Sequence, residues 1–243
     1  MKVLGYSERG AMNALLFEIS HCQHSGQLLE RLLARAVFPF CVPPAGSIES
    51  ATVLVEQSLS DFGNADAILL LERPVGKMAV FVEAKVKASQ VVRWTIADEF
   101  AVFQRGLAAK VSSSNLFTQL YHKIRFVHAA CGEGRQLHDG VRFPPCSTKS
   151  VRRIGSNPVV LRALEMVTPY LQDVFYLAIV PEDAANLDRF VRDTLKGFAP
   201  VDFEAWDVMR WGFLPWSEVK AFCTMEGLHR AREVLEFNEG QIC

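Results

Sequence analysis

The stretch AVFVEAKVK, residues 79–87, alternates in the manner of a β-strand. Its even-numbered positions are all small and apolar, which predicts that this side of the strand faces inward. The odd-numbered positions include Phe81, Glu83, Lys85 and Lys87. An acid and two lysines on one side of a half-buried strand indicate either a charged strand edge, where lysines oppose aggregation, or a chemical site.

Two further strands are predicted just before this stretch. Segments 52–58 (TVLVEQS) and 64–71 (NADAILLL) have the apolar and β-branched composition of strands, and residues 77–86 form the third. The turn-forming segments LSDFG and ERPVG separate them. The pattern predicts an antiparallel meander of three strands.

Helical periodicity surrounds the meander. The rest of the chain predicts helices at 8–24, 96–107, 113–128, 182–196 and 225–238, a helix that begins at Asn157-Pro158, and strands at 174–180 and 206–213. This order predicts an α/β fold with a central mixed sheet that helices flank on both faces.

Length and composition limit the class of protein. The 243 residues, half of them apolar, predict one domain over 1–243, with a basic loop or insertion at about 131–157 and a C-terminal elaboration from about residue 200. The chain contains neither an apolar run of about 18 residues nor a signal-like start. We therefore expect a cytoplasmic protein with no membrane partner. The six cysteines form no CxxC pair, which argues against a zinc ribbon.

Basic residues are concentrated in one part of the chain. Segment 103–153 holds nine Lys and Arg but only two acids, Glu133 and Asp139, although the net charge of the whole chain is −1. A local basic surface suits a polyanion such as a nucleic acid. A solvated basic loop is the alternative interpretation.

Asp66 supplies a second acid near Glu83. If segments 64–71 and 77–86 pair as a hairpin, the two carboxylates can lie side by side. Adjacent buried carboxylates repel each other, and a divalent cation with oxygen ligands, Mg²⁺ or Mn²⁺, relieves the repulsion. Lys85 could then position a water or stabilise charge on a phosphate. Alternatively, Asp66 caps a turn near Asn64, and Glu83 and Lys85 lie on an exposed edge.

A second Glu-x-Lys triplet, Glu218-Val219-Lys220, shows how little the triplet means alone, since about one is expected by chance in a chain of this length. It follows Pro215-Trp216-Ser217, which is typical of a helix start. Positions two apart on a helix do not face each other, so this copy does not predict a site.

Asp66 in GNADAILLL, with Glu83 and Lys85 in AVFVEAKVK, resembles the motif of the PD-(D/E)XK nuclease superfamily. The resemblance covers roughly residues 10–180 and implies a restriction-endonuclease-like fold with Mg²⁺-dependent phosphodiester hydrolysis, usually of DNA. It implies that Asp66, Glu83 and the backbone carbonyl of Ala84 bind metal and that Lys85 is catalytic. The proline of the motif is replaced by Ala65, which weakens the likeness.

Members of this superfamily often add an acid from the first helix. By that resemblance Glu18 is the candidate, and Glu56 on the first strand is its rival. Many members also carry a Q-x-x-x-Y pattern on the helix after the lysine. Gln119 and Tyr121 depart from this spacing, so neither is assigned a catalytic role.

The helix at 113–128 has polar residues on one side. Gln119, His122, Lys123 and Arg125, together with Lys87, are candidates for contacts with a nucleic acid; a solvated helix face is the alternative. We expect a Mg²⁺-dependent nuclease that acts on DNA and can form a homodimer. The alternatives are a non-catalytic nucleic-acid-binding module and a protein-interaction module with a structural ion network.

Overall fold

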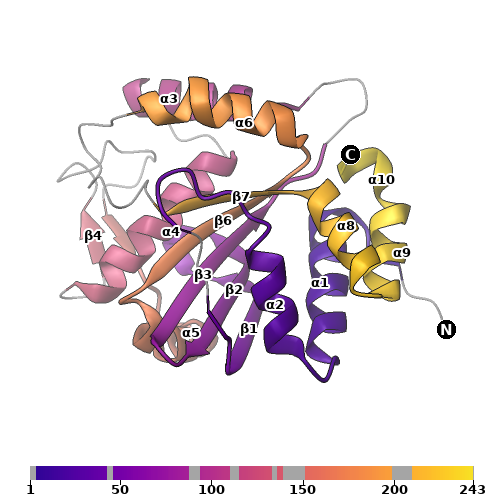
Figure 1. Cartoon of the computed structure of the whole chain (residues 1–243). Helices are drawn as coiled ribbons and strands as arrows, with labels where there is room; N and C mark the ends of the chain where they lie inside the picture. The colour runs from indigo at the N-terminus through magenta and orange to yellow at the C-terminus, as the bar shows by residue number, and fades with distance from the viewer. Residues whose placement is uncertain are drawn as a thin grey trace.

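A five-stranded mixed sheet forms the centre of the computed structural model (Figure 1). The structure describes residues 4–42, 46–87, 94–109, 115–132, 136–138, 151–198 and 210–242. The strand order is β1-β2-β3-β6-β7. The predicted α/β class is therefore confirmed. The strands are β1 (Ser50–Ser58), β2 (Asn64–Arg73), β3 (Gly76–Ala84), β6 (Val174–Val180) and β7 (Trp211–Pro215).

The predicted meander is confirmed. Strands β1, β2 and β3 pair antiparallel in sequence order, and the pairing of β2 with β3 ends at Ala67 and Val82. Strands β6 and β7 then add parallel to β3. Parallel neighbours need long connections, which helices provide. Strand β7 begins at Trp211, later than the predicted strand, and residues 199–209 lie outside the described part.

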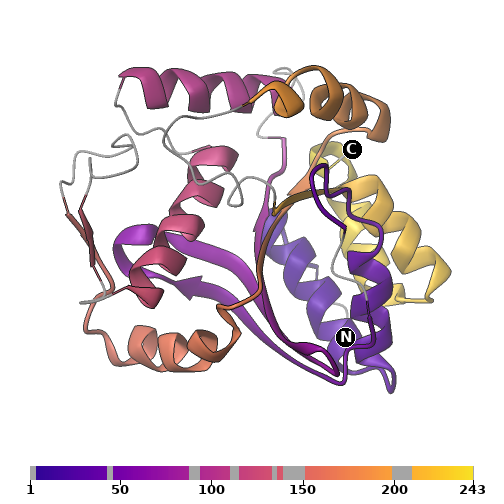
Figure 2. The ribbon, with the colours of Figure 1, turned by 60° about the vertical axis from the view of Figure 1, so that its left-hand side comes forward.

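Helices cover both faces of the sheet (Figure 2), as predicted. In Figure 1 one group, formed by the N-terminal and C-terminal segments, lies on the right of the sheet, and the other lies on the left and across the top. The first group is α1 (Ser7–Ser20), α2 (Ser25–Leu33), α8 (Trp216–Met225), α9 (His229–Phe237) and α10 (Glu239–Ile242). The second is α3 (Ile96–Ala109), α4 (Leu116–Cys131), α5 (Pro158–Val167) and α6 (Ala184–Asp193), with 3₁₀ turns η1 (Ser60–Phe62), η3 (Thr168–Tyr170) and η4 (Leu195–Gly197) elsewhere in the chain. No helix in the described part of the chain is long and apolar enough to cross a membrane.

Burial of β3 differs from the expectation. The alternation predicted one inward side, but every residue from Met78 to Ala84 is at most 1% exposed. The reason is the position of β3 between β2 and β6, with helices packed on both of its faces. Glu83 is therefore an acid inside the protein, and the interpretation of β3 as an exposed charged edge is wrong.

The basic segment that was predicted to be a loop or insertion, at about 131–157, is described only in part. It contains two short antiparallel strands, β4 (Gln136–His138) and β5 (Val151–Arg153), while residues 133–135 and 139–150 lie outside the described part. Helix α4 contacts β4 on one side and β3 and β6 on another. This small sheet therefore helps to enclose α4.

The two ends of the chain are tied together at the start of α1. The buried Asn238, which follows α9, accepts a hydrogen bond from Ser7 N (3.1 Å) and donates one to the Gly5 carbonyl (2.9 Å). Gly5 and Gly10 approach so closely that a Cβ added to Gly10 would lie 2.3 Å from the carbonyl carbon of Gly5. These contacts fix the position of the first turn of α1.

We predict that Gly10→Ala destabilises the protein. Alanine normally stabilises a helix relative to glycine by about 1 kcal/mol. Here the added methyl group overlaps the Gly5 backbone, and overpacking costs about 1–3 kcal/mol. Urea denaturation should show a lower free energy of unfolding. Gly197→Ala is the control, because nothing lies within 4 Å of the position that its added Cβ would take; equal stability of Gly10→Ala and wild type would contradict the prediction.

Candidate active site

Asp66 and Glu83 lie next to each other where the pairing of β2 and β3 ends. Ala67 and Val82 form the last pair, so the next opposed positions are Asp66 and Glu83. Opposed residues in an antiparallel pair share a face of the sheet. Beyond the last pair, the Ala84 N–H donates to Asp66 Oδ2 (2.8 Å) instead of to a strand carbonyl. The hairpin prediction thus correctly brings the two acids together.

Lys123 of α4 is the ion-pair partner of Glu83. Its Nζ lies 2.6 Å from Glu83 Oε1, and each side chain is 1% exposed. The same Nζ donates to the Asn64 carbonyl at the start of β2 (2.7 Å). Two opposite charges at this distance attract strongly in a site shielded from water. The pair therefore ties α4 to both β2 and β3.

Lys85 follows β3 and its charge acts on both carboxyl groups. Its backbone N–H donates to the Ile179 carbonyl (2.8 Å), and its carbonyl accepts from Trp216 Nε1 (2.8 Å). These two bonds fix the backbone at the end of β3, and the side chain is half-buried. The structure therefore gathers Asp66, Glu83 and Lys85, and it adds Lys123.

Burial dominates the electrostatics of the two acids. It raises the pKa of Glu83 to about 7, although Lys123 opposes the shift, and the charge of Asp66 adds to it. Burial also raises the pKa of Asp66, against the Ala84 N–H and Lys85, and the carboxylate of Glu8 raises it further. Both acids are thus held where additional positive charge would stabilise their ionised forms.

The donor set suits a hydrated Mg²⁺ or Mn²⁺. Within the described part of the chain, no three His, Cys, Asp or Glu side chains gather closely enough to hold a metal by themselves. Mg²⁺ commonly binds through one or two carboxylates and keeps several waters. Two adjacent carboxylates with raised pKa values, Asp66 and Glu83, fit that requirement, with the Ala84 carbonyl as a further oxygen in the same strand.

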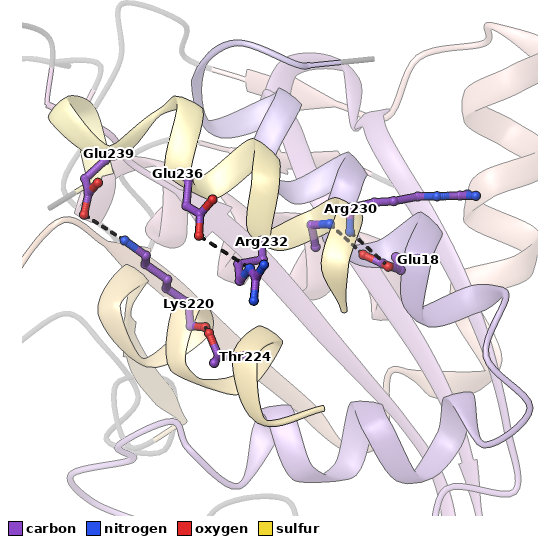
Figure 3. A network of polar contacts seen from close by, with 8 residues as sticks. Glu18, Lys220, Thr224, Arg230, Arg232, Glu236 and Glu239 are labelled. Carbon is purple, nitrogen blue, oxygen red and sulfur yellow. Dashed lines mark hydrogen bonds and ion pairs between the residues drawn. The ribbon is translucent and has the colours of Figure 1, made fainter. Parts of the chain in front are cut away.

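The expectation that Glu18 joins this site is wrong. Figure 3 shows Glu18 directed at the start of α9, where its carboxylate accepts from Arg230 N (3.1 Å) and Ala231 N (2.6 Å). The acid of α1 whose charge reaches Asp66 is Glu8, in the first turn. Glu18 follows ten positions later, about 15 Å along the helix.

Glu56, the rival candidate, is also directed elsewhere. Its backbone has a φ of +50°, which interrupts β1 opposite Asp66. Its exposed side chain accepts from Asn13 Nδ2 (3.3 Å) and lies 3.8 Å from Arg9 Nη1. Both partners belong to α1. The left-handed backbone turns Glu56 out of the regular strand alternation, which the residue pattern did not reveal.

The polar side predicted for the helix at 113–128 is not a solvent-exposed face. Lys123 is 1% exposed and Arg125 0%, and the ring nitrogen His122 Nε2 is buried. Gln119 is half-buried, and its Oε1 is buried without a hydrogen-bond partner in the described part of the chain. The cause is that α3, β4, η1 and the central sheet contact α4 on several sides. Lys123 and Arg125 are therefore interior residues in this structure.

Part of the basic segment is likewise internal. Arg152 is 5% exposed and donates to the Asp61 carbonyl, whereas Arg105 and Arg153 are exposed. Four of the nine basic residues lie outside the described part, so any surface that they form is not defined. They are Lys110, Arg135, Arg142 and Lys149.

Lys87, the remaining candidate for a nucleic-acid contact, lies outside α4, beyond the end of β3. It lines a cavity of about 260 Å³ with Trp94, Glu182 and Asn186. Glu182 follows β6 and Lys87 follows β3, so the cavity lies beyond the carboxyl ends of parallel strands, where α/β proteins commonly bind ligands. Lys87, one of the proposed nucleic-acid contacts, therefore borders a cavity.

The second Glu-x-Lys triplet behaves as its helical interpretation predicts. On α8, Glu218 pairs with Arg35, which follows α2 (2.8 Å), and Lys220 pairs with Glu239 of α10 (2.7 Å; Figure 3). Glu218 and Lys220 therefore form ion pairs with different partners. This triplet provides a matched control for the Glu-x-Lys triplet on β3.

Three comparisons were made with known proteins. Neither the protein-family models, nor the curated proteins, nor the solved structures gave a match. Function must therefore be inferred from the chemistry and geometry of the site itself.

We predict that His122 makes the protein sensitive to acid. Burial, with Arg152, Lys123 and Arg125 nearby, lowers the pKa of His122 from 6.5 to about 3. The unfolded chain therefore binds more protons than the folded protein between these values, so stability falls as the pH falls through this window, by roughly 5 kcal/mol at most.

Urea unfolding of wild type and His122→Gln between about pH 7 and pH 4 checks this. The difference in unfolding free energy between the two proteins should move in favour of the variant as the pH falls. A difference that stays constant across the window would contradict the prediction.

Proposed function

We propose that this protein is a divalent-metal-dependent nuclease with a restriction-endonuclease-like fold. One observation carries the proposal: Asp66 and Glu83 are adjacent where the β2–β3 pairing ends, and the charge of Lys85 acts on both. Two carboxylates and a lysine at one strand end suit phosphodiester hydrolysis. The resemblance of the same three residues to the PD-(D/E)XK motif supports this assignment.

The architecture supports the same proposal at the level of the fold. An antiparallel meander is followed by helices and then by a strand parallel to β3, with helices on both faces of the sheet. This is the order of elements that the resemblance implies. Fold alone does not specify function, so the proposal depends on the site.

Each residue has a defined role in the proposal. Asp66, Glu83 and the Ala84 carbonyl hold Mg²⁺ or Mn²⁺. Such an ion, when bound, polarises a phosphate and makes a bound water more acidic. Lys85 orients the attacking water or stabilises negative charge on the phosphate. DNA is the proposed substrate, and Lys87 at the neighbouring cavity is the proposed backbone contact.

The test is cleavage of plasmid and oligonucleotide DNA with Mg²⁺ or Mn²⁺. We expect Glu83→Gln and Lys85→Met each to lower the rate by about 100-fold or more, because the first removes a proposed metal ligand and the second removes positive charge beside the reacting phosphate. Circular dichroism and urea unfolding show whether each variant is folded. EDTA should abolish cleavage by the wild type.

Glu218→Gln and Lys220→Met are the matched controls, because they make the same changes in the triplet on α8. Both should cleave at the wild-type rate. Equal rates for wild type, Glu83→Gln and Lys85→Met would refute the mechanism, whatever the rates of the control variants.

A structural ion network is the second candidate, and the buried Glu83–Lys123 pair favours it. Replacing a buried ion pair by apolar residues of similar volume is often neutral or stabilising. This candidate predicts no heat of Mg²⁺ binding by calorimetry and no loss of stability in a Glu83→Leu, Lys123→Met double variant. Mg²⁺ binding that depends on Glu83 would exclude it.

A further inference from the structure

We infer that Lys123 is a built-in counter-ion that occupies the cation position beside Glu83 and competes with a divalent cation for that carboxylate. The inference rests on the proposed function, because it concerns the same site. It is independent of whether the loaded site cleaves DNA. Lys123 comes from α4, whereas the acids and Lys85 come from the β2–β3 hairpin and its end.

The contacts of Lys123 hold its ammonium group at one defined place beside Glu83. Its Nζ lies 2.6 Å from Glu83 Oε1 and 2.7 Å from the Asn64 carbonyl, and its side chain is 1% exposed. The ammonium therefore has two oxygen ligands and is shielded from solvent, as a bound cation would be.

Competition follows from charge. Glu83 is buried, so a second cation brought to its carboxylate meets the charge of Lys123 at short range, where little water screens it. Metal binding at Glu83 must therefore displace the ammonium from Oε1 or share the carboxylate with it, and either lowers the affinity. The position of Lys123 also explains how β3 tolerates an acid in its interior without a metal.

Lys220 provides a matched comparison elsewhere on the molecule. Its Nζ lies 2.7 Å from Glu239 Oε1, almost the distance of the Glu83–Lys123 pair, but the Glu239 side chain is 60% exposed (Figure 3). Water screens such a surface pair, and its loss has little effect. Lys220→Met therefore removes the same charge without touching the proposed site.

The experiment measures Mg²⁺ binding by calorimetry, without DNA, for wild type, Lys123→Met and Lys220→Met. Titrations at about pH 9 favour the ionised form of Glu83 after its partner is removed. We expect Lys123→Met to bind Mg²⁺ about tenfold or more tightly than wild type. Lys220→Met should bind as wild type does. The inference would be overturned if Lys123→Met bound Mg²⁺ no more tightly than wild type does.

Lys123→Met leaves a buried acid without its cation, which destabilises the folded variant in the absence of metal. Thermal unfolding, measured with and without Mg²⁺, tests the inference for a destabilised variant as well. Mg²⁺ should raise the Tm of Lys123→Met more than the Tm of wild type, since a ligand that binds the folded state stabilises it more when it binds more tightly. In a Glu83→Gln, Lys123→Met double variant this extra stabilisation should disappear. An equal Mg²⁺ effect on wild type and Lys123→Met would count against the inference.

The outcomes separate this inference from the proposed function. Tighter Mg²⁺ binding by Lys123→Met, with no DNA cleavage by any protein, supports the counter-ion and refutes the nuclease. Metal-dependent cleavage by wild type, with unchanged Mg²⁺ affinity in Lys123→Met, supports the nuclease and refutes the counter-ion. Absence of Mg²⁺ binding by wild type and Lys123→Met alike refutes both.

Discussion

An acid buried near the end of the central strand is the constraint on which much of this structure depends. Glu83 lies in β3, the middle strand, and helices cover both faces there. Removing an ionised carboxylate from water is costly unless an opposite charge accompanies it. Lys123 meets this need, and to do so α4 must pack against the sheet beside the start of β2. The ion pair thus adds to the buried apolar contacts that hold α4 against the sheet.

Helix α4 encloses further charged and polar side chains. A helix with polar residues around part of its circumference normally turns them to solvent. Here β4, η1 and α3 surround α4, so Arg125 is enclosed as well as Lys123. Burial, together with these positive charges, keeps the neighbouring His122 neutral by lowering its pKa. Buried charged side chains, and not only apolar ones, therefore make the contacts between α4 and the elements around it.

Helix α1 serves two parts of the molecule. Its first turn brings Glu8 within electrostatic reach of Asp66, and its last turn brings Glu18 to the N-terminus of α9. A carboxylate at a helix N-terminus satisfies free backbone N–H groups and interacts favourably with the helix dipole. Asn238 after α9 holds the start of α1 in turn. The two ends of the chain therefore fix the surroundings of the candidate site together.

The sequence by itself determined the meander, the helices around it and the adjacency of Asp66 and Glu83. These follow from local rules, because a strand alternates with period two and a short turn sets the register of a hairpin. The position of Lys123 in the inward stripe of its helix, three after Leu120 and four before Val127, was also a readable signal. Only the tertiary structure decided that both faces of β3 are buried and that Lys123 is the partner of Glu83. It also decided that Glu8, not Glu18, approaches Asp66. These depend on packing between segments far apart in the chain, which local periodicity does not encode.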